Sequence, residues 1–230
     1  MKEFLTNSLF FGVVLTFAAY EIGLLLKRKV KLAICNPLLM AAVIIIGVLL
    51  ALDVDYETYN AGAGYISYFL TPATVSLAIP LYRQLTLLKK YPLAIFAGIT
   101  AGVLTAMISI LCVSLLFGLD HRQYVTLLPK SITTAIGMGM SEKMGGIVTL
   151  TVVSICITGI LGNVTADTVL RIAKINEPVA RGLAIGTSSH ALGTTRAMEM
   201  GEVEGAMSSL SIVVAGVLTV IAASVFANFI

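Results

Sequence analysis

Charged side chains are scarce in this sequence of 230 residues: only 12% are Asp, Glu, Lys or Arg, while 58% are hydrophobic. An average soluble domain is about 25% charged, so the composition excludes an ordinary soluble domain, a disordered tail and a nucleic-acid-binding protein. The formal net charge of +3 is too small to indicate an acidic partner. A bilayer crossing takes roughly 20 apolar residues, which leaves no room for a separate soluble domain. We expect one transmembrane domain over residues 1–230, embedded in the lipid bilayer.

Cysteine and histidine are also rare. The three cysteines, Cys35, Cys112 and Cys156, lie in apolar runs and have no disulfide or metal-site spacing. Ser189 and His190 are adjacent, so on a helix they would point about 100° apart and could not form a nucleophile–base pair. The other histidine falls in a polar loop, and the phosphate-binding pattern G-x-x-x-x-G-K-[ST] is absent. We therefore expect no enzyme activity, metal or cofactor, and no ATP-driven transport by this chain alone.

Plain spanning helices are expected in five apolar stretches. The first ends in positive charge without a small-residue cleavage site, so we expect a retained span rather than a signal peptide. The five stretches are 8–26, 33–52, 91–117, 146–170 and 206–230.

Three further stretches, 64–81, 124–141 and 182–199, are apolar but interrupted by Pro, Gly and runs of hydroxyl residues. The positive-inside tendency places the basic cluster after the first span in the cytoplasm, and hence the N-terminus outside. If 124–141 and 182–199 are re-entrant hairpins, more Lys and Arg residues lie inside than if both stretches cross fully. The re-entrant topology is favoured, and full crossing stays open as the alternative.

The interrupted stretches resemble one another. Residues 72–79 align with 129–136 on a shared Pro and hydroxyl pattern, and 189–193 align with 133–137. Each interrupted stretch precedes a smooth helix. In the re-entrant topology, repeat units 124–170 and 182–230 enter from opposite sides, an inverted repeat of the kind found in secondary transporters. The expected fold class is therefore an all-α polytopic membrane protein: an inverted-repeat, transporter-like bundle with broken or re-entrant helices.

Irregular backbone survives at membrane depth only where it is buried in protein or lines a wet cavity. The interrupted stretches carry hydroxyls, two cations and helix N-termini, which together suit a small oxyanion such as a carboxylate. The candidate substrate-binding residues are Lys130, Ser131, Thr133, Thr134, Ser188, Ser189, His190, Thr194, Thr195 and Arg196.

Each charged candidate also has a purely structural interpretation. Arg196 has a planar fork that suits a carboxylate, but Lys130 and Arg196 could instead reach a membrane surface or pair with Glu142 or Glu199. His190 could carry a proton for coupled transport or serve as a hydrogen-bonded core residue.

Three runs carry a resemblance to a known family: 128–136 (LPKSITTAI), 180–197 (ARGLAIGTSSHALGTTRA) and 201–210 (GEVEGAMSSL). The chain resembles the LrgB/CidB family of bacterial inner-membrane proteins over essentially its whole length. It departs from the family at Ala135, where many relatives are expected to have Pro, and this bears on the sharpness of the helix break.

The resemblance implies two functions. Bacterial members are described as antiholin-like or holin-like modulators of murein hydrolase activity, usually with a small LrgA/CidA-type membrane partner. The similar plastid protein is a glycolate/glycerate translocator, and some bacterial relatives are linked to pyruvate or other short carboxylates. Our leading hypothesis is an alternating-access transporter of small organic monocarboxylates, with proton coupling open; the alternative is a lysis regulator. The sequence also leaves open the particular carboxylate and whether the chain forms a homo-oligomer.

Overall fold

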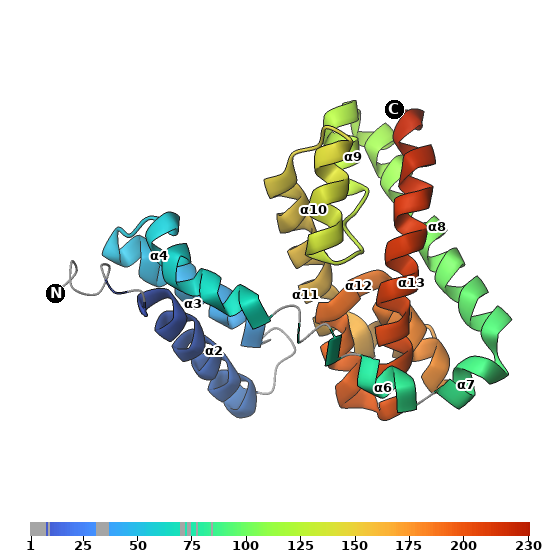
Figure 1. Ribbon diagram of the computed structural model, residues 1–230, viewed down its shortest axis with the longest axis horizontal. Coiled ribbons are helices and arrows are strands. Elements are labelled where there is room, and N and C mark those ends of the chain that lie inside the picture. Colours follow the sequence, from blue (N-terminus) through green and yellow to red (C-terminus); the bar gives the residue numbers. More distant parts are fainter. Residues whose placement is uncertain are drawn as a thin grey trace. The chain divides into compact units, whose positions relative to one another are not determined.

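The computed structural model describes residues 8, 10–30, 37–69, 72, 75–76, 78–83 and 85–230, and these are helical with no strands. They fall into two compact units, residues 1–76 and 77–230, each described here by itself. Figure 1 shows the helices of both units. The expectation of a single transmembrane domain stays a prediction.

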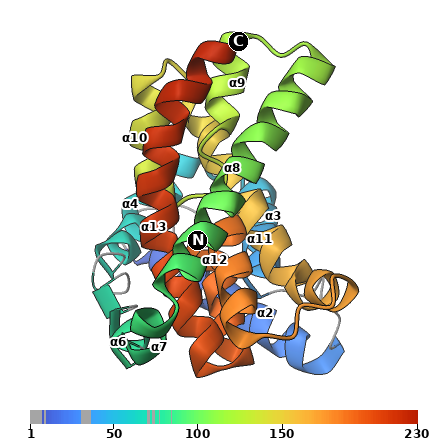
Figure 2. The same ribbon diagram turned by 90° about the vertical axis from the view of Figure 1, so that its right-hand side faces the viewer.

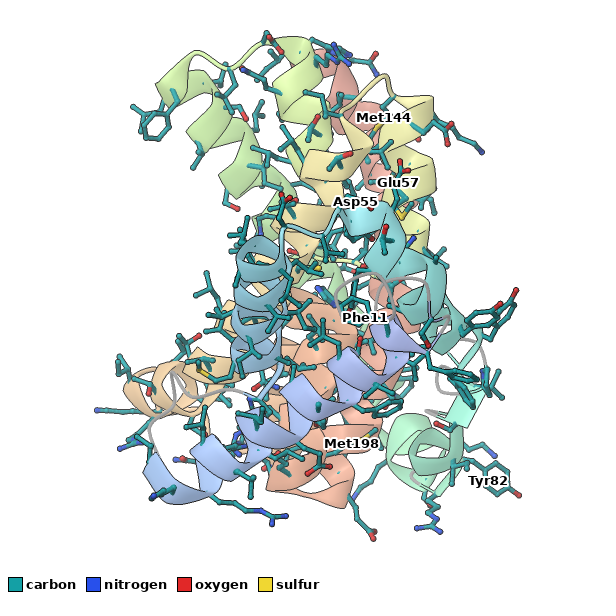
Figure 3. The ribbon with its side chains drawn as sticks, turned by 90° about the vertical axis from the view of Figure 1, so that its left-hand side faces the viewer. Phe11, Asp55, Glu57, Tyr82, Met144 and Met198 are labelled. Carbon is teal, nitrogen blue, oxygen red and sulfur yellow. The ribbon has the colours of Figure 1, made fainter. Side chains whose placement is uncertain are left out.

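In the smaller unit, α2 (Phe11–Val30) packs against α3 (Pro37–Leu52) and α4 (Tyr56–Ala63), and α4 continues into a 3₁₀ helix at Gly64–Phe69. Asp55 caps α4 by accepting a 2.6 Å hydrogen bond from the backbone N–H of Thr58. This bond lowers the pKa of the Asp55 carboxyl from its usual value. Figure 3 labels Asp55 at this helix start.

The larger unit contains two short helices, α6 (Ala78–Arg83) and α7 (Leu85–Lys90), followed by α8 (Pro92–Phe117). Next come α9 (His121–Leu127), α10 (Thr134–Lys143), α11 (Val148–Ile172), α12 (Pro178–Met200) and α13 (Glu202–Phe226). A final 3₁₀ turn covers Ala227–Phe229.

Among the described residues, three helical segments are long and apolar enough to cross a bilayer: Pro92–Phe117, Val148–Ile172 and Glu202–Phe229. They coincide with three of the five plain spans expected from the sequence. The other two expected spans overlap α2 and α3, and α3 is a shorter apolar helix of 16 residues. Part of the interrupted stretch 64–81 lies outside the described residues, so its crossing stays a prediction.

The first interrupted stretch of the larger unit folds back on itself. Thr151 Oγ1, on α11, donates to the carbonyl of Thr126 in α9 at 2.9 Å and lies 2.7 Å from the hydroxyl oxygen of Ser141 in α10. Because Thr126 and Ser141 meet at one residue, the chain must reverse between them. We call residues 121–143 the first hairpin; its tip is the non-helical segment 128–133.

The second interrupted stretch, α12, also doubles back. Arg181 Nη2 lies 3.6 Å from Met200 Sδ, whereas a straight helix would separate residues 19 positions apart by about 28 Å. The reversal occurs at His190, whose backbone has φ 44° and ψ −140°. A positive φ is strained for a residue other than glycine, so the surrounding packing must hold this turn. We call Pro178–Met200 the second hairpin.

The two hairpins enter from opposite ends of α13. In the first hairpin, Tyr124 Oη donates to the carbonyl of Phe226, at the end of α13, at 2.9 Å. In the second, Arg181 pairs with Glu204, in the first turn of α13, at 3.4 Å. Figure 2 shows α9 beside the C-terminal end of α13 and α12 beside its beginning. Figure 3 shows Met144, after α10, and Met198, near the end of α12, at opposite ends of this unit.

The expected fold class, a helical membrane protein with broken or re-entrant helices in an inverted repeat, is therefore confirmed. Each hairpin is followed by a long helix of 25 residues, α11 or α13. The aligned residues Thr133 and Ser189 occupy equivalent places: Thr133 directly precedes α10, and Ser189 directly precedes the break at His190.

Glycines allow the second hairpin to lie close to its neighbours. A Cβ added at Gly182 would lie 2.5 Å from the carbonyl oxygen of Glu204 and 2.8 Å from Met207 Cβ, both on α13. On α8, a Cβ at Gly102 would lie 2.6 Å from Thr187 Cγ2. Small residues at these positions let the helix backbones pack closely. In a bilayer, such van der Waals packing stabilises helix association in place of the hydrophobic effect.

We predict that Gly182→Ala destabilises the protein by about 1–3 kcal/mol, because α12 must move away from α13 to accept the new methyl group. The measurement is the thermal unfolding midpoint of the purified protein in detergent. Gly139→Ala is the matched control, since a Cβ at Gly139 has no heavy atom within 4 Å; it should leave the midpoint unchanged or raise it slightly. Equal midpoints for both variants would contradict this account of the packing.

Candidate substrate cavity between the hairpin tips

A cavity of about 1220 Å³ lies in the larger unit, lined by α8, α11, α12 and the tip of the first hairpin. The two hairpins contribute adjacent polar surfaces to it although they come from opposite ends of the bundle. The polar lining consists chiefly of Lys130, Ser131, Thr158, Thr187, Ser188 and Ser189.

Lys130 supplies a positive charge to this cavity. Its ammonium donates a 3.1 Å hydrogen bond to Ser131 Oγ, and no carboxylate pairs with it among the described residues. Both residues belong to the non-helical tip, which ends where α10 begins at Thr134. A partly buried, unpaired cation beside a hydroxyl and a helix N-terminus can bind an anion.

The second hairpin brings three consecutive hydroxyls to the cavity. Ser188 Oγ donates to the carbonyl of Ala184 at 2.8 Å, and Ser189 Oγ lies 3.0 Å from Ser188 Oγ. Thr187 is 5% exposed, and its hydroxyl has no hydrogen-bond partner in the described part of the chain. A buried polar group without a partner is costly, and the Thr187 oxygen is itself buried, so its missing bond is a cost to the fold and not a donor presented to the cavity.

His190 and Thr194 lie at the break in α12 and do not line the cavity. His190 is buried, and its Nε2 lies 3.1 Å from the carbonyl oxygen of Ile155 on α11. The Thr194 hydroxyl donates to the His190 carbonyl at 2.9 Å and lies 2.7 Å from Ser208 Oγ on α13. These bonds satisfy the backbone that the break exposes.

Three other candidates from the sequence also lie outside the cavity lining. Thr133 and Thr134, both partly buried, form the beginning of α10. Thr195 is exposed and accepts a 2.9 Å hydrogen bond from Asn163 Nδ2 on α11. The structure thus brings Lys130, Ser131, Ser188 and Ser189 together, and distributes the remaining candidates around them.

Arg196 is engaged in ion pairs. Its Nε and Nη2 donate to Asp167 Oδ2 at 3.0 and 2.5 Å, and its Nη1 pairs with Glu199. Pairing with Glu199 is one of the structural alternatives that the sequence left open. The bond to Asp167 joins the second arm of the second hairpin to α11.

Sequence reasoning missed several residues that line the cavity. Tyr91, Thr105 and Thr158 lie inside stretches read as smooth spans. Lys90 ends α7, and Glu177 directly precedes α12. The spacing of Gly98 and Gly102, four residues apart, could have indicated the face of α8 that turns toward α12. Among the described residues, no group of three or more His, Cys, Asp or Glu side chains could hold a metal ion.

Comparison with known proteins gives the family. The model of the LrgB-like family matches residues 16–229. The chain belongs to the LrgB-like family. It is 38% identical, over 98% of each chain, to a protein of Bacillus cereus (strain B4264) and to one of Bacillus anthracis (strain CDC 684 / NRRL 3495). Both relatives carry the name antiholin-like protein LrgB. No solved structure matches the chain. The family expected from the sequence is thereby confirmed, and this LrgB-family chain is a membrane protein.

We predict that Arg196→Asp lowers the thermal unfolding midpoint, because it replaces an attraction to Asp167 by a repulsion between α12 and α11. Adding Asp167→Arg should recover part of the loss, since the pair is restored with its charges exchanged. Arg171→Asp, at an exposed position near the end of α11, controls for the change in net charge. If the effects of the two substitutions on the unfolding midpoint simply add, the ion pair does not stabilise the contact between α12 and α11.

Proposed function

We propose that this LrgB-family protein is an inner-membrane carrier of small organic monocarboxylates that works by alternating access, and that it is not an enzyme. The observation that carries the proposal is the unpaired ammonium of Lys130 in a cavity lined by the tips of both hairpins. In bacteria this membrane is the plasma membrane, with the N-terminus of the chain outside.

The chemistry of the cavity supports an anionic substrate. A cation away from bulk water gains more from an anion than it would at the protein surface, since the local dielectric constant is lower. Ser131, Ser188 and Ser189 offer hydroxyl donors near the same place. A carboxylate accepts several such hydrogen bonds at once, whereas a neutral ligand would leave the charge of Lys130 unbalanced.

The extent of the cavity supports alternating access. Along α8 the lining begins at Ala94 and ends at Ala106, which covers about 18 Å of a helix about 39 Å long. Past Ala106, α8 no longer lines the cavity, and its buried Met107 and Ile110 belong to an apolar core with Tyr124 and Val125 of the first hairpin. The same core continues along α8 through Ile95, Ile99 and Val103. A cavity that reaches the hairpin tips from one end and is packed at the other is the arrangement expected of a carrier open to one side.

We predict that Lys130→Gln reduces uptake of labelled pyruvate or glycolate into proteoliposomes at least tenfold, mainly by raising KM, because the carboxylate loses its charged partner. Lys143→Gln is the matched control: Lys143 is exposed, belongs to the same hairpin and does not line the cavity. It should transport like the wild type. Wild-type uptake by Lys130→Gln would remove Lys130 from the mechanism, and no uptake by any version would contradict transport itself. Repeating the assay with an imposed pH gradient tests proton coupling.

A second function has its own support. The relatives' shared name, antiholin-like protein LrgB, favours a regulator of murein hydrolase activity and lysis that acts through a small LrgA/CidA-type membrane partner. The name supports regulation more than transport, while the cavity supports transport. Under regulation alone, the cavity would matter less than the surface that meets the partner.

We predict that a partner of this type, expressed together with the protein, copurifies with it from mild detergent if regulation is the function. Lysis rates after a cell-wall challenge should then follow the amount of complex and remain the same in Lys130→Gln and Lys143→Gln cells. A lysis phenotype that follows Lys130→Gln instead would tie regulation to the cavity. Uptake measured with and without the partner shows whether the two functions are connected.

A further inference from the structure

The cavity has a polar end and an apolar end. Towards the hairpin tips, its lining residues are lysine, serine and threonine, as described above. Away from the tips, each of the three helices contributes apolar side chains: Ala94 and Ile95 on α8, Val169 and Leu170 on α11, and Val179 and Leu183 on α12.

Contacts between the helices show that the polar and the apolar lining residues lie at different depths in the cavity. On α8 and α12, a Cβ at Gly102 would meet Thr187, and a Cβ at Gly98 would lie 3.6 Å from Leu183 Cδ1. The two helices therefore run side by side in the same direction here. On α11, Gly162 lies against Ser189, whereas Leu170 packs with Ile185 nearer the start of α12. On α12, Thr187 and Ser189 thus lie nearer the hairpin tips than Leu183 and Ile185, and on α11 Thr165 lies between Gly162 and the aliphatic Val169 and Leu170.

The cavity is much larger than a two- or three-carbon acid requires. Its volume of about 1220 Å³ corresponds to roughly 40 water molecules at about 30 Å³ each. It exceeds the range of about 300–1,000 Å³ that is usual for sites of drug-sized ligands. A short carboxylate held at Lys130 would leave the aliphatic walls facing water.

Among the described lining residues, the cations are Lys130 at the polar end and Lys90 at the mouth, and the lining also includes Glu177. Lys90, at the mouth, lies about 20 Å from the level of Thr105 along α8, and its ammonium lies 5.1 Å from the ring centre of Tyr91. A second carboxylate on a ligand of ordinary length would therefore fall among Ile95, Val179 and Leu183. An ionised group placed among aliphatic side chains is strongly disfavoured.

We infer that the preferred ligand is an amphiphilic monocarboxylate, with its carboxylate at Lys130 and Ser131 and a hydrocarbon chain along the walls formed by α8, α11 and α12. This inference rests on the proposed carboxylate site. It makes chain length the main determinant of affinity.

The experiment measures how well acetate, butyrate, hexanoate and octanoate compete with labelled pyruvate for uptake, and how far each raises the thermal unfolding midpoint of the detergent-solubilised protein. Each added methylene buries apolar surface, so the inhibition constant should fall up to about fourfold per methylene until the chain reaches the mouth. Hexanol, which lacks the charge, and adipate, which has a second carboxylate, should both bind at least tenfold more weakly than hexanoate.

Two wall substitutions locate the chain. Ala184→Phe and Ala94→Phe place a ring in the apolar part of the cavity, and both positions are exposed to it, so either can accept the ring without disturbing the core. Each should weaken octanoate at least tenfold and leave acetate unchanged. Ala97→Phe is the matched control, because Ala97 is exposed on α8 but does not line the cavity; it should behave as the wild type.

The outcomes separate this inference from the proposed function. Uptake of short acids with no dependence on chain length would overturn the inference and leave transport standing. Binding that strengthens with chain length and is lost in Ala184→Phe, without uptake, would support the inference while transport fails. Hexanol that binds as well as hexanoate would mark a groove for lipid chains, and would overturn it.

Discussion

Hydrocarbon offers no hydrogen bonds to a backbone that leaves helical geometry, and the larger unit is organised around meeting that constraint. At the break in α12, the His190 carbonyl accepts from Thr194, and the Leu192 carbonyl accepts from Asn163 Nδ2 at 2.8 Å. At the first hairpin, the Thr126 carbonyl accepts from Thr151. Side chains of α11 and α12 thus replace the lost helical bonds, and the broken segments remain in the protein interior, where the cavity forms.

The two hairpins are held in place by different kinds of interaction. The second hairpin is held at both arms by ion pairs, Arg181 to Glu204 on α13 and Arg196 to Asp167 on α11. Side chains of the second hairpin also lie in close contact with glycines on the neighbouring helices α8, α11 and α13. The first hairpin is held by hydroxyl bonds around Thr151 and by the apolar core near Tyr124. The two repeats are therefore held by different kinds of interaction, although they share one order of helices.

Much of this architecture could be predicted from the sequence. Long apolar runs specify α8, α11 and α13 because the period and length of a spanning helix are visible locally. Pro129 and clustered hydroxyls marked the first break, glycines and clustered hydroxyls marked the second, and the alignment of 133–137 with 189–193 marked their equivalence. The candidate site was harder to predict. Lys130 and Ser188 could be found from their residue types, but Thr105 and Thr158 look like ordinary positions of smooth helices.

By itself, the sequence determined that the chain is a helical membrane protein of the LrgB-like family and predicted three interrupted segments, because composition, period and motif are local properties. Only the tertiary structure decided which polar groups meet. Arg196 and Asp167 are 29 positions apart, and their pairing depends on how α12 folds back against α11. Lys130 lines the cavity without a paired carboxylate among the described residues, because the first hairpin ends there. Such juxtapositions depend on the direction in which each arm runs, and residue type alone does not encode that direction.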